Sequence, residues 1–199
     1  MITKVNDIDL KILILFTNGY NKEYYIREVA KLVNISSRTA LLTLSKLEKR
    51  GILESRTRGK IKNYKIIKSF ISREYFILTE QYKKISFLEK NHLLKEIFEK
   101  IDKHIQGISI IFGSYAKGTQ HKNSDIDLFI VGKYDEEMIK NFGKMYGVDI
   151  NIKSYPLRTF EKEIYEDILL KEIVENHVVI KSVEQFVESV LRWIKLNGA

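Results

Sequence analysis

Cysteine is absent from this 199-residue chain, and proline occurs only once. Without cysteine the chain can form no disulfide, no thiolate zinc site and no cysteine nucleophile. Its four histidines are scattered and form no pair at the spacing of helical metal ligands. Any metal ion should therefore be held by carboxylates.

Long apolar runs are missing as well. No run approaches the roughly 20 apolar residues that a helix needs to span a bilayer, and Asp7 and Asp9 stand where a signal peptide would be apolar. We therefore expect a cytoplasmic protein with no membrane partner. With 44% hydrophobic and 30% charged residues, the chain is long enough for one or two domains with a proper core.

Positive charge is concentrated in the first third of the chain. Residues 1–68 hold 15 lysines and arginines against 6 aspartates and glutamates, whereas residues 69–199 hold 19 against 20. The basic excess therefore belongs to the first segment alone. This distribution is typical of a nucleic-acid-binding domain joined to a near-neutral one.

The basic segment has the pattern of three helices and a hairpin. Apolar residues recur at helical spacing over 8–16 and again over 26–33. Ser36 is a suitable N-cap for a third helix that ends at Gly51. The buried stripe of this helix is Ala40, Leu44 and Leu47. A hairpin with an almost wholly basic tip should follow over residues 54–67.

This order of elements resembles the winged helix-turn-helix domain of prokaryotic transcription regulators. In that family the third helix enters the major groove and the wing contacts the phosphates beside it. The resemblance implies contacts of the third helix with base edges by Arg38, Thr39, Leu42 and Lys46. It implies contacts of the wing with the backbone of double-stranded DNA by Arg56, Arg58, Lys60 and Lys62. The alternative is a solvated basic face on a helical module that binds protein.

Residues 69–104 are helical in pattern and carry no motif. Five apolar residues recur at spacings of 4, 3, 4 and 3, namely Ile71, Tyr75, Leu78, Tyr82 and Ile85. Two heptads are few for a coiled coil, so we expect this seam to pack on the neighbouring domain. Dimerisation is the alternative, because a homodimer would suit a winged helix that reads a two-fold operator. A second amphipathic helix over 94–105 should cover a sheet.

The chemistry is carried by two motifs near the centre of the chain. The apolar run Ile108–Phe112 predicts a buried strand, and Gly113 and Ser114 break it. The short segment that follows can start a helix. Backbone N–H groups therefore converge at the break, as in a phosphate-binding turn. Asp125 and Asp127 alternate with apolar residues, and the two-residue period of a strand places both carboxylates on one face, about 6.6 Å apart along the backbone. A divalent cation would remove the repulsion between them.

Together these motifs resemble the signature of the nucleotidyltransferase fold shared by DNA polymerase beta, kanamycin nucleotidyltransferase and the minimal nucleotidyltransferases of prokaryotes. That signature is Gly-Ser, a spacer with a second Gly, and then Ser-Asp-x-Asp-Leu. The matching residues are Gly113, Ser114, Ala116, Gly118, Ser124, Asp125, Asp127 and Leu128. Each motif alone is weak evidence, but the two at this spacing and on two apolar strands are specific.

The resemblance implies a nucleotidyl transfer to a hydroxyl group with release of pyrophosphate. The substrate would be a nucleoside triphosphate, ATP by analogy with the minimal nucleotidyltransferases. Two Mg²⁺ ions would be held by Asp125 and Asp127, with Asp149 as a third carboxylate on the neighbouring strand over 148–152. The residues implied to bind the nucleotide, or to shape the loop around it, are Gly113, Ser114, Lys117 and Ser124.

The expected fold class is α+β. A winged helix-turn-helix domain occupies residues 1–68, a helical linker 69–104, and a nucleotidyltransferase domain with a small mixed sheet 105–199. Within the last segment we expect one helix over about 159–174 and a closing helix over 183–196. The packing face of the closing helix is Phe186, Val190 and Trp193.

Three functions stay open at this point. The first is an active transferase joined to a DNA-binding regulator, in which AMP is attached to a partner toxin of the HEPN class and the protein represses its own transcription, as the resemblance to minimal nucleotidyltransferases implies. The second is a transcription regulator whose transferase domain senses nucleotide with little turnover. The third is a repair polymerase, which the absence of a visible thumb or lyase domain disfavours.

Overall fold

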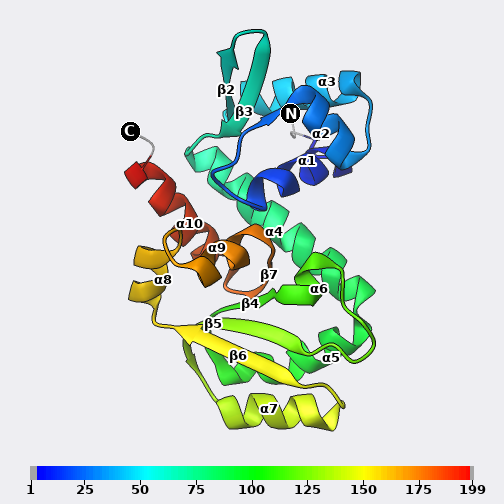
Figure 1. Ribbon diagram of the computed structural model, residues 1–199, viewed down its shortest axis with the longest axis vertical. Helices are drawn as coiled ribbons and strands as arrows, with labels where there is room; N and C mark the ends of the chain where they lie inside the picture. Colours follow the sequence, from blue (N-terminus) through cyan, green and yellow to red (C-terminus); the bar gives the residue numbers. More distant parts are fainter. Residues whose placement is uncertain (1–3, 198–199) are drawn as a thin grey trace.

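One long helix, α4 (Phe70–Lys90), joins the two parts of the molecule (Figure 1). The structure is a computed structural model that describes residues 4–197, with side chains up to residue 193. Three helices and a hairpin lie at one end of α4, and a four-stranded sheet with its covering helices lies at the other. Within the described residues, no helix has both the length and the apolar character needed to cross a bilayer.

The N-terminal part is built from short elements around a small antiparallel sheet. These elements are α1 (Asp7–Thr17), β1 (Tyr24–Tyr25), α2 (Ile26–Val33), α3 (Ser37–Lys49), β2 (Leu53–Arg58) and β3 (Ile61–Ile66), with strand order β1-β3-β2. The Ser36 hydroxyl accepts the N–H of Thr39 at 3.0 Å, which confirms the predicted cap of α3. The buried stripe of α3 is also confirmed. Strand β1 was not expected, because two residues are too few to show a period.

Helix α4 buries a different face from the one its apolar seam indicates. Ile71, Leu78 and Ile85 are 42%, 43% and 53% exposed. Of the seam, Tyr75 is buried, and the other buried residues of α4 lie off the seam, namely Ser72, Phe76, Thr79, Glu80 and Lys83. The prediction that the whole seam packs on the neighbouring domain is therefore wrong. The face that contacts α1, β7 and the C-terminal helix carries polar groups that find their partners only in the folded molecule.

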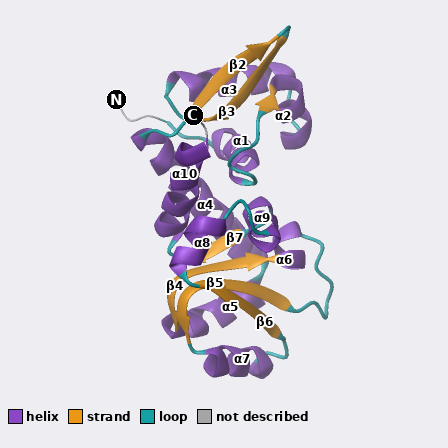
Figure 2. Cartoon of the chain, turned by 60° about the vertical axis from the view of Figure 1, so that its left-hand side comes forward, coloured by secondary structure: helices purple, strands orange, loops and turns teal. Residues whose placement is uncertain are grey.

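The C-terminal part is a mixed sheet covered on both faces. Its strands are β4 (Ile105–Phe112), β5 (Ile126–Tyr134), β6 (Ile150–Tyr155) and β7 (Val178–Lys181), in the order β6-β5-β4-β7. Strands β5 and β6 are parallel, and the other pairs are antiparallel. Helices α5 (His92–Ile101) and α7 (Glu136–Met145) cover one face, and the last three helices lie against the other (Figure 2). The predicted α+β class with a mixed sheet is confirmed.

The segment after β6 forms two helices where one was expected. Helix α8 (Leu157–Glu163) ends, and α9 (Ile168–Glu175) starts at a new cap, because the Asp167 carboxylate accepts the N–H of Leu170 at 2.9 Å. The closing helix α10 (Val183–Asn197) buries Phe186 and Val190 as predicted. One hydrophobic cluster runs from α1 through α4 to α10, so the two parts of the molecule share a core.

Candidate functional site

The glycine bend and the aspartate pair meet where β4 ends and β5 begins. The register of these strands sets Phe112 opposite Asp127, and the chain turns at Gly113 into the short helix α6 (Gly113–Lys117). Gly113 has φ +67°, and a Cβ atom placed on it would lie 2.1 Å from Oδ2 of Asp127. A side chain at residue 113 would therefore strain the backbone and also collide with the carboxylate. The half-buried carboxylate of Asp127 lies directly over the bend.

Asp125 accepts a hydrogen bond from an amide of the neighbouring strand. The parallel register sets Asn151 of β6 beside Asp127, and Nδ2 of Asn151 donates to Oδ2 of Asp125 at 3.2 Å. Asp149 is exposed just before β6, and its backbone carbonyl accepts the N–H of Ile126 at 2.8 Å. Sequence reasoning missed Asn151. Its position two residues after Asp149, in an alternating stretch, was the signal that could have found it.

The described residues contain no group of three or more His, Cys, Asp and Glu side chains that could hold a metal ion. The expected set of Asp125, Asp127 and Asp149 is thus not assembled, because the strand position beside Asp127 belongs to Asn151 and Asp149 precedes the strand. The donors that do come together are two carboxylates and an amide. They fit Mg²⁺, which proteins commonly bind through one or two carboxylates together with substrate phosphates.

Ser124 and Lys117 are engaged elsewhere in the structure. The Ser124 hydroxyl accepts the N–H of His121 at 2.8 Å, so it caps the turn that leads into β5. The ammonium of Lys117 forms a 2.7 Å ion pair with Glu172 of α9. The expected contact of Lys117 with a triphosphate would require this exposed pair to open. Ser114 lies half-buried in the first turn of α6, next to Gly113.

The outer surface of α3 and the hairpin carries unpaired positive charge. Arg38, Arg56, Arg58 and Lys60 are exposed, and within residues 4–193 none of them takes part in an ion pair. Leu42 is 62% exposed beside them, and the Thr39 hydroxyl bonds to that of Ser36 at 2.8 Å.

Two lysines expected on this basic surface are held by acids. The ammonium of Lys46 pairs with the fully buried carboxylate of Asp9 in α1. That of Lys62 pairs with Glu48 of α3 at 2.7 Å. Both partners lie far from the lysines in sequence or on another element, so helical and strand periodicity could not reveal them. A groove of about 840 Å³ between α2, α3 and the hairpin adds Arg27, which the sequence reasoning did not include.

Two solved structures are similar to the chain at low identity. One, described as "Crystal structure of the toxin-antitoxin with AMP-PNP", is 18% identical over 54% of this chain and 89% of its own, with a TM-score of 0.35. The other, described as "Structure of TrmBL2, an archaeal chromatin protein, shows a novel mode of DNA binding", is 15% identical over 86% of this chain and 70% of its own, with a TM-score of 0.29.

No curated protein matches the chain. A family model does match its C-terminal part. That match extends over residues 92–188, from α5 into α10, and so contains the glycine bend, Asp125 and Asp127. The model is that of the nucleotidyltransferase domain, and the match supports such a domain in this part of the chain.

Proposed function

We propose that the protein is a DNA-binding nucleotidyltransferase that transfers a nucleotidyl group from a nucleoside triphosphate to a hydroxyl acceptor. The observation that carries the proposal is the contact between the two motifs. Asp127 lies over Gly113 so closely that no Cβ fits between them, and Asp125 stands two residues away at the same end of the sheet. The bend and the carboxylates therefore form one site.

In this site the chain binds the triphosphate at the bend. Backbone N–H groups at Gly113 and Ser114, with the Ser114 hydroxyl, hold its terminal phosphates. Asp125 and Asp127 would hold two Mg²⁺ ions, which supply charge neutralisation for the triphosphate when bound. Asn151 fixes the orientation of Asp125 through the 3.2 Å hydrogen bond.

The transfer itself replaces one phosphorus–oxygen bond by another. The acceptor oxygen forms a bond to the α-phosphorus, the bond from the α-phosphorus to the bridging oxygen breaks, and pyrophosphate leaves. Asp149 is assigned as the general base that receives the proton of the acceptor hydroxyl; its carboxylate is exposed, and its backbone carbonyl bonds to Ile126, the residue after Asp125.

The finer parts of the proposal rest on the resemblance of the motif to minimal nucleotidyltransferases. They are that the nucleotide is ATP, that AMP is the group transferred, and that the acceptor is a hydroxyl on a partner toxin of the HEPN class. The reaction would take place in the cytoplasm, where ATP and DNA are both present.

The N-terminal part is proposed to be a winged helix-turn-helix that binds double-stranded DNA and represses the protein's own gene. Its support is the order of three helices and a hairpin, with Arg38 on α3 and three further exposed cations on the hairpin. Those three are Arg56, Arg58 and Lys60. Cations without acidic partners are free to neutralise phosphates. Lys46 and Lys62 would contribute less, because each is paired.

A specific observation favours one alternative, a regulator that senses nucleotide without turnover. The described residues bring together two carboxylates where three were expected, and an amide occupies the position beside Asp127. A site with too few metal ligands would bind nucleotide and turn it over slowly.

A labelling experiment tests the proposal. The protein is incubated with Mg²⁺ and ATP labelled in either the α- or the γ-phosphate, with a co-purifying partner protein as acceptor. We expect label on the partner from α-labelled ATP only, with one pyrophosphate released per label. Transfer of the γ-label would show a kinase and contradict the proposal. Binding of ATP without transfer to any hydroxyl acceptor would favour the sensor.

A further inference from the structure

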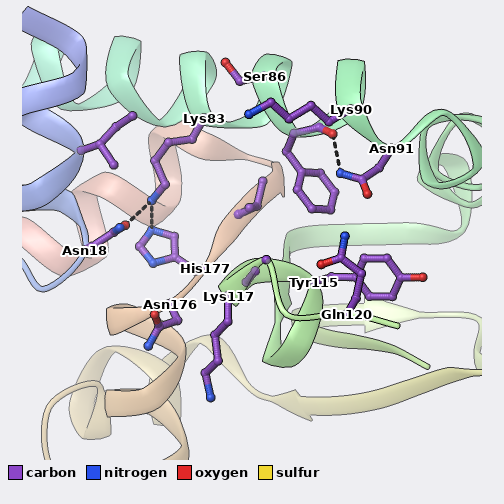
Figure 3. A pocket seen from close by; sticks show the side chains of 15 residues that line it. Asn18, Lys83, Ser86, Lys90, Asn91, Tyr115, Lys117, Gln120, Asn176 and His177 are labelled. Atoms are coloured by element: carbon purple, nitrogen blue, oxygen red, sulfur yellow. Dashed lines mark hydrogen bonds between the residues drawn. The ribbon is translucent and has the colours of Figure 1, made fainter. Parts of the chain in front are cut away.

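A pocket separate from the aspartate site lies between the two parts of the molecule. Helix α4 forms one wall, α6 and the start of the following loop form the opposite wall, and the end of α1 and the α9–β7 connection close it (Figure 3). Its volume is about 410 Å³, within the range of small-molecule sites. Neither the glycine bend nor Asp125 or Asp127 lines it.

One end of the pocket is a buried polar cluster whose members satisfy one another. Lys83 Nζ contacts the Glu80 carboxylate at 3.0 Å, Asn18 Oδ1 at 3.1 Å and His177 Nε2 at 3.1 Å. His177 Nδ1 lies 2.9 Å from the carbonyl of Val174, which assigns a proton to Nδ1. Nε2 lies 3.1 Å from Oε1 of Glu80 as well as from Lys83, and in the neutral ring it accepts from Lys83. All three hydrogens of the ammonium are thus used, and the cluster forms a fixed wall.

The rest of the pocket is lined by cations and hydrogen-bonding groups, two of which have no partner among the described residues. Its lining includes Lys83, Lys90 and Lys117 but no Asp or Glu. The ammonium of Lys117 turns out to Glu172, whereas Lys90 forms no ion pair within the described residues. Oε1 of Gln120 is buried and accepts no hydrogen bond from any described residue. A buried amide oxygen without a donor is costly, and a ligand N–H could supply that donor.

Aromatic rings and further amides complete the lining. Phe87 of α4 and Tyr115 of α6 line the pocket with aromatic rings. Asn91 and Asn176 add side-chain amides (Figure 3), and the Asn91 amide donates to the carbonyl of Phe87 at 2.8 Å. Rings suit the flat face of a nucleobase, amides suit its polar edge, and a free lysine suits a phosphate.

We propose that this pocket is a second ligand site that binds a nucleoside monophosphate. The base lies between Phe87 and Tyr115 and donates an N–H to Gln120, and the phosphate lies near Lys90. Because the walls come from α1 and α4 as well as from α6 and β7, a bound ligand holds the N-terminal part against the sheet. Ligand binding should therefore raise the melting temperature of the whole chain.

Equilibrium dialysis of the full chain against labelled AMP in EDTA tests this inference. EDTA removes divalent cations and so prevents any AMP binding that needs Mg²⁺ at the aspartate pair. We expect about one AMP per chain, and at least tenfold weaker binding after Lys90→Glu or Gln120→Leu. Lys95→Glu, the same charge change on an exposed position of α5, should leave the affinity unchanged, and so should Asp127→Asn. This experiment measures AMP binding, so its result does not depend on whether the protein catalyses nucleotidyl transfer.

Three results would overturn the inference. One is no AMP binding at millimolar concentration. Another is binding that Asp127→Asn abolishes and Lys90→Glu leaves intact, which would place the nucleotide at the aspartate site. The third is binding of ribose 5-phosphate or inorganic phosphate as tightly as AMP, which would show an anion site that does not recognise a base.

Discussion

At the scale of single residues, the carboxylate of Asp127 lies where a methyl group on Gly113 would have to be. The motif spacing predicted that both residues belong to one site, but their contact depends on the β4–β5 register, which the sequence does not display. The contact of Asn151 with Asp125 was not predicted for the same reason, because it depends on the parallel pairing of β5 with β6. Residue types and neighbours in sequence were therefore predictable, and cross-strand partners were not.

Replacing Gly113 by alanine separates backbone strain from the collision with Asp127. Gly113→Ala should abolish nucleotidyl transfer, because the added Cβ would lie 2.1 Å from Oδ2 of Asp127 and displace it. Gly59→Ala is the control, since Gly59 has a similar φ of +62° and a Cβ added there would meet no other described residue within 4 Å beyond its chain neighbours. Each change costs about 1 kcal/mol or more in backbone strain. Chemical denaturation and label transfer should show both variants weakened in stability and only Gly113→Ala inactive. Equal activity of the two would contradict the assigned geometry.

At the scale of elements, regular periodicity predicted α3 and its cap well and α4 poorly. Ala40, Leu44 and Leu47 form an apolar stripe that needs no distant partner. The buried face of α4 instead includes Glu80 and Lys83, whose burial depends on each other and on His177 from a remote segment. No local pattern marks such residues as buried.

This cluster makes stability depend on pH. Burial alone would raise the pKa of Glu80, but the neighbouring Lys83 and, after it, His177 lower that pKa to about 2 from 4.5. Burial lowers the pKa of His177 below 6.5. Both groups therefore bind fewer protons in the folded protein than in the unfolded chain at mildly acidic pH. The contribution of these two groups to the free energy of unfolding should be complete above about pH 6.5 and fall as the pH falls, with about 3 kcal/mol lost between pH 4.5 and 2 for Glu80.

Urea denaturation between pH 3 and 8 measures this dependence. His177→Gln should flatten the plot of the free energy of unfolding against pH just below pH 6.5. Below pH 4.5 the plot should stay unchanged. A free energy of unfolding that rises on acidification from pH 6.5 to 4 would contradict the assignment of a neutral His177 beside a charged Glu80.

The hairpin should contribute to DNA affinity through its unpaired arginines. Arg56→Gln with Arg58→Gln should reduce the slope of log K against log salt by about two, since each phosphate contact contributes about 0.9. Lys62→Gln should change the slope less, because Lys62 is held by Glu48 at 2.7 Å. Fluorescence anisotropy with a labelled duplex at several salt concentrations measures the slopes. An equal effect of all three substitutions would show that the ion pair does not matter for binding.

At the scale of the whole molecule, a shared core from α1 to α10 ties the basic part to the sheet. The charge asymmetry predicted two functional parts, and the boundaries at 68 and 104 remain predictions. Composition could not reveal that α4 is buried between the parts, nor that it leaves an apolar ridge of Ile71, Leu78 and Ile85 at the surface.

That ridge is proposed to be the contact between two copies of the chain. Leu78→Glu should shift a dimer to monomer with little effect on the free energy of unfolding of the monomer, because Leu78 is 43% exposed. Sedimentation velocity at micromolar concentration measures the state of each protein. Phe70→Glu, at an 81% exposed position at the start of the same helix, is the control. If the wild-type protein sediments as a monomer at every concentration measured, the ridge is not a contact between two copies of the chain.

Asp125 and Asp127 over the Gly113 bend are proposed to perform nucleotidyl transfer. Release of pyrophosphate coupled to transfer of α-label from ATP measures this reaction. We expect Asp127→Asn to lower the rate more than about 100-fold, beyond the loss typical of residues that only orient a metal ligand. Asp135→Asn, at the cap of α7, should retain the rate, because an asparagine also caps a helix. Transfer at the wild-type rate by Asp127→Asn would contradict the account.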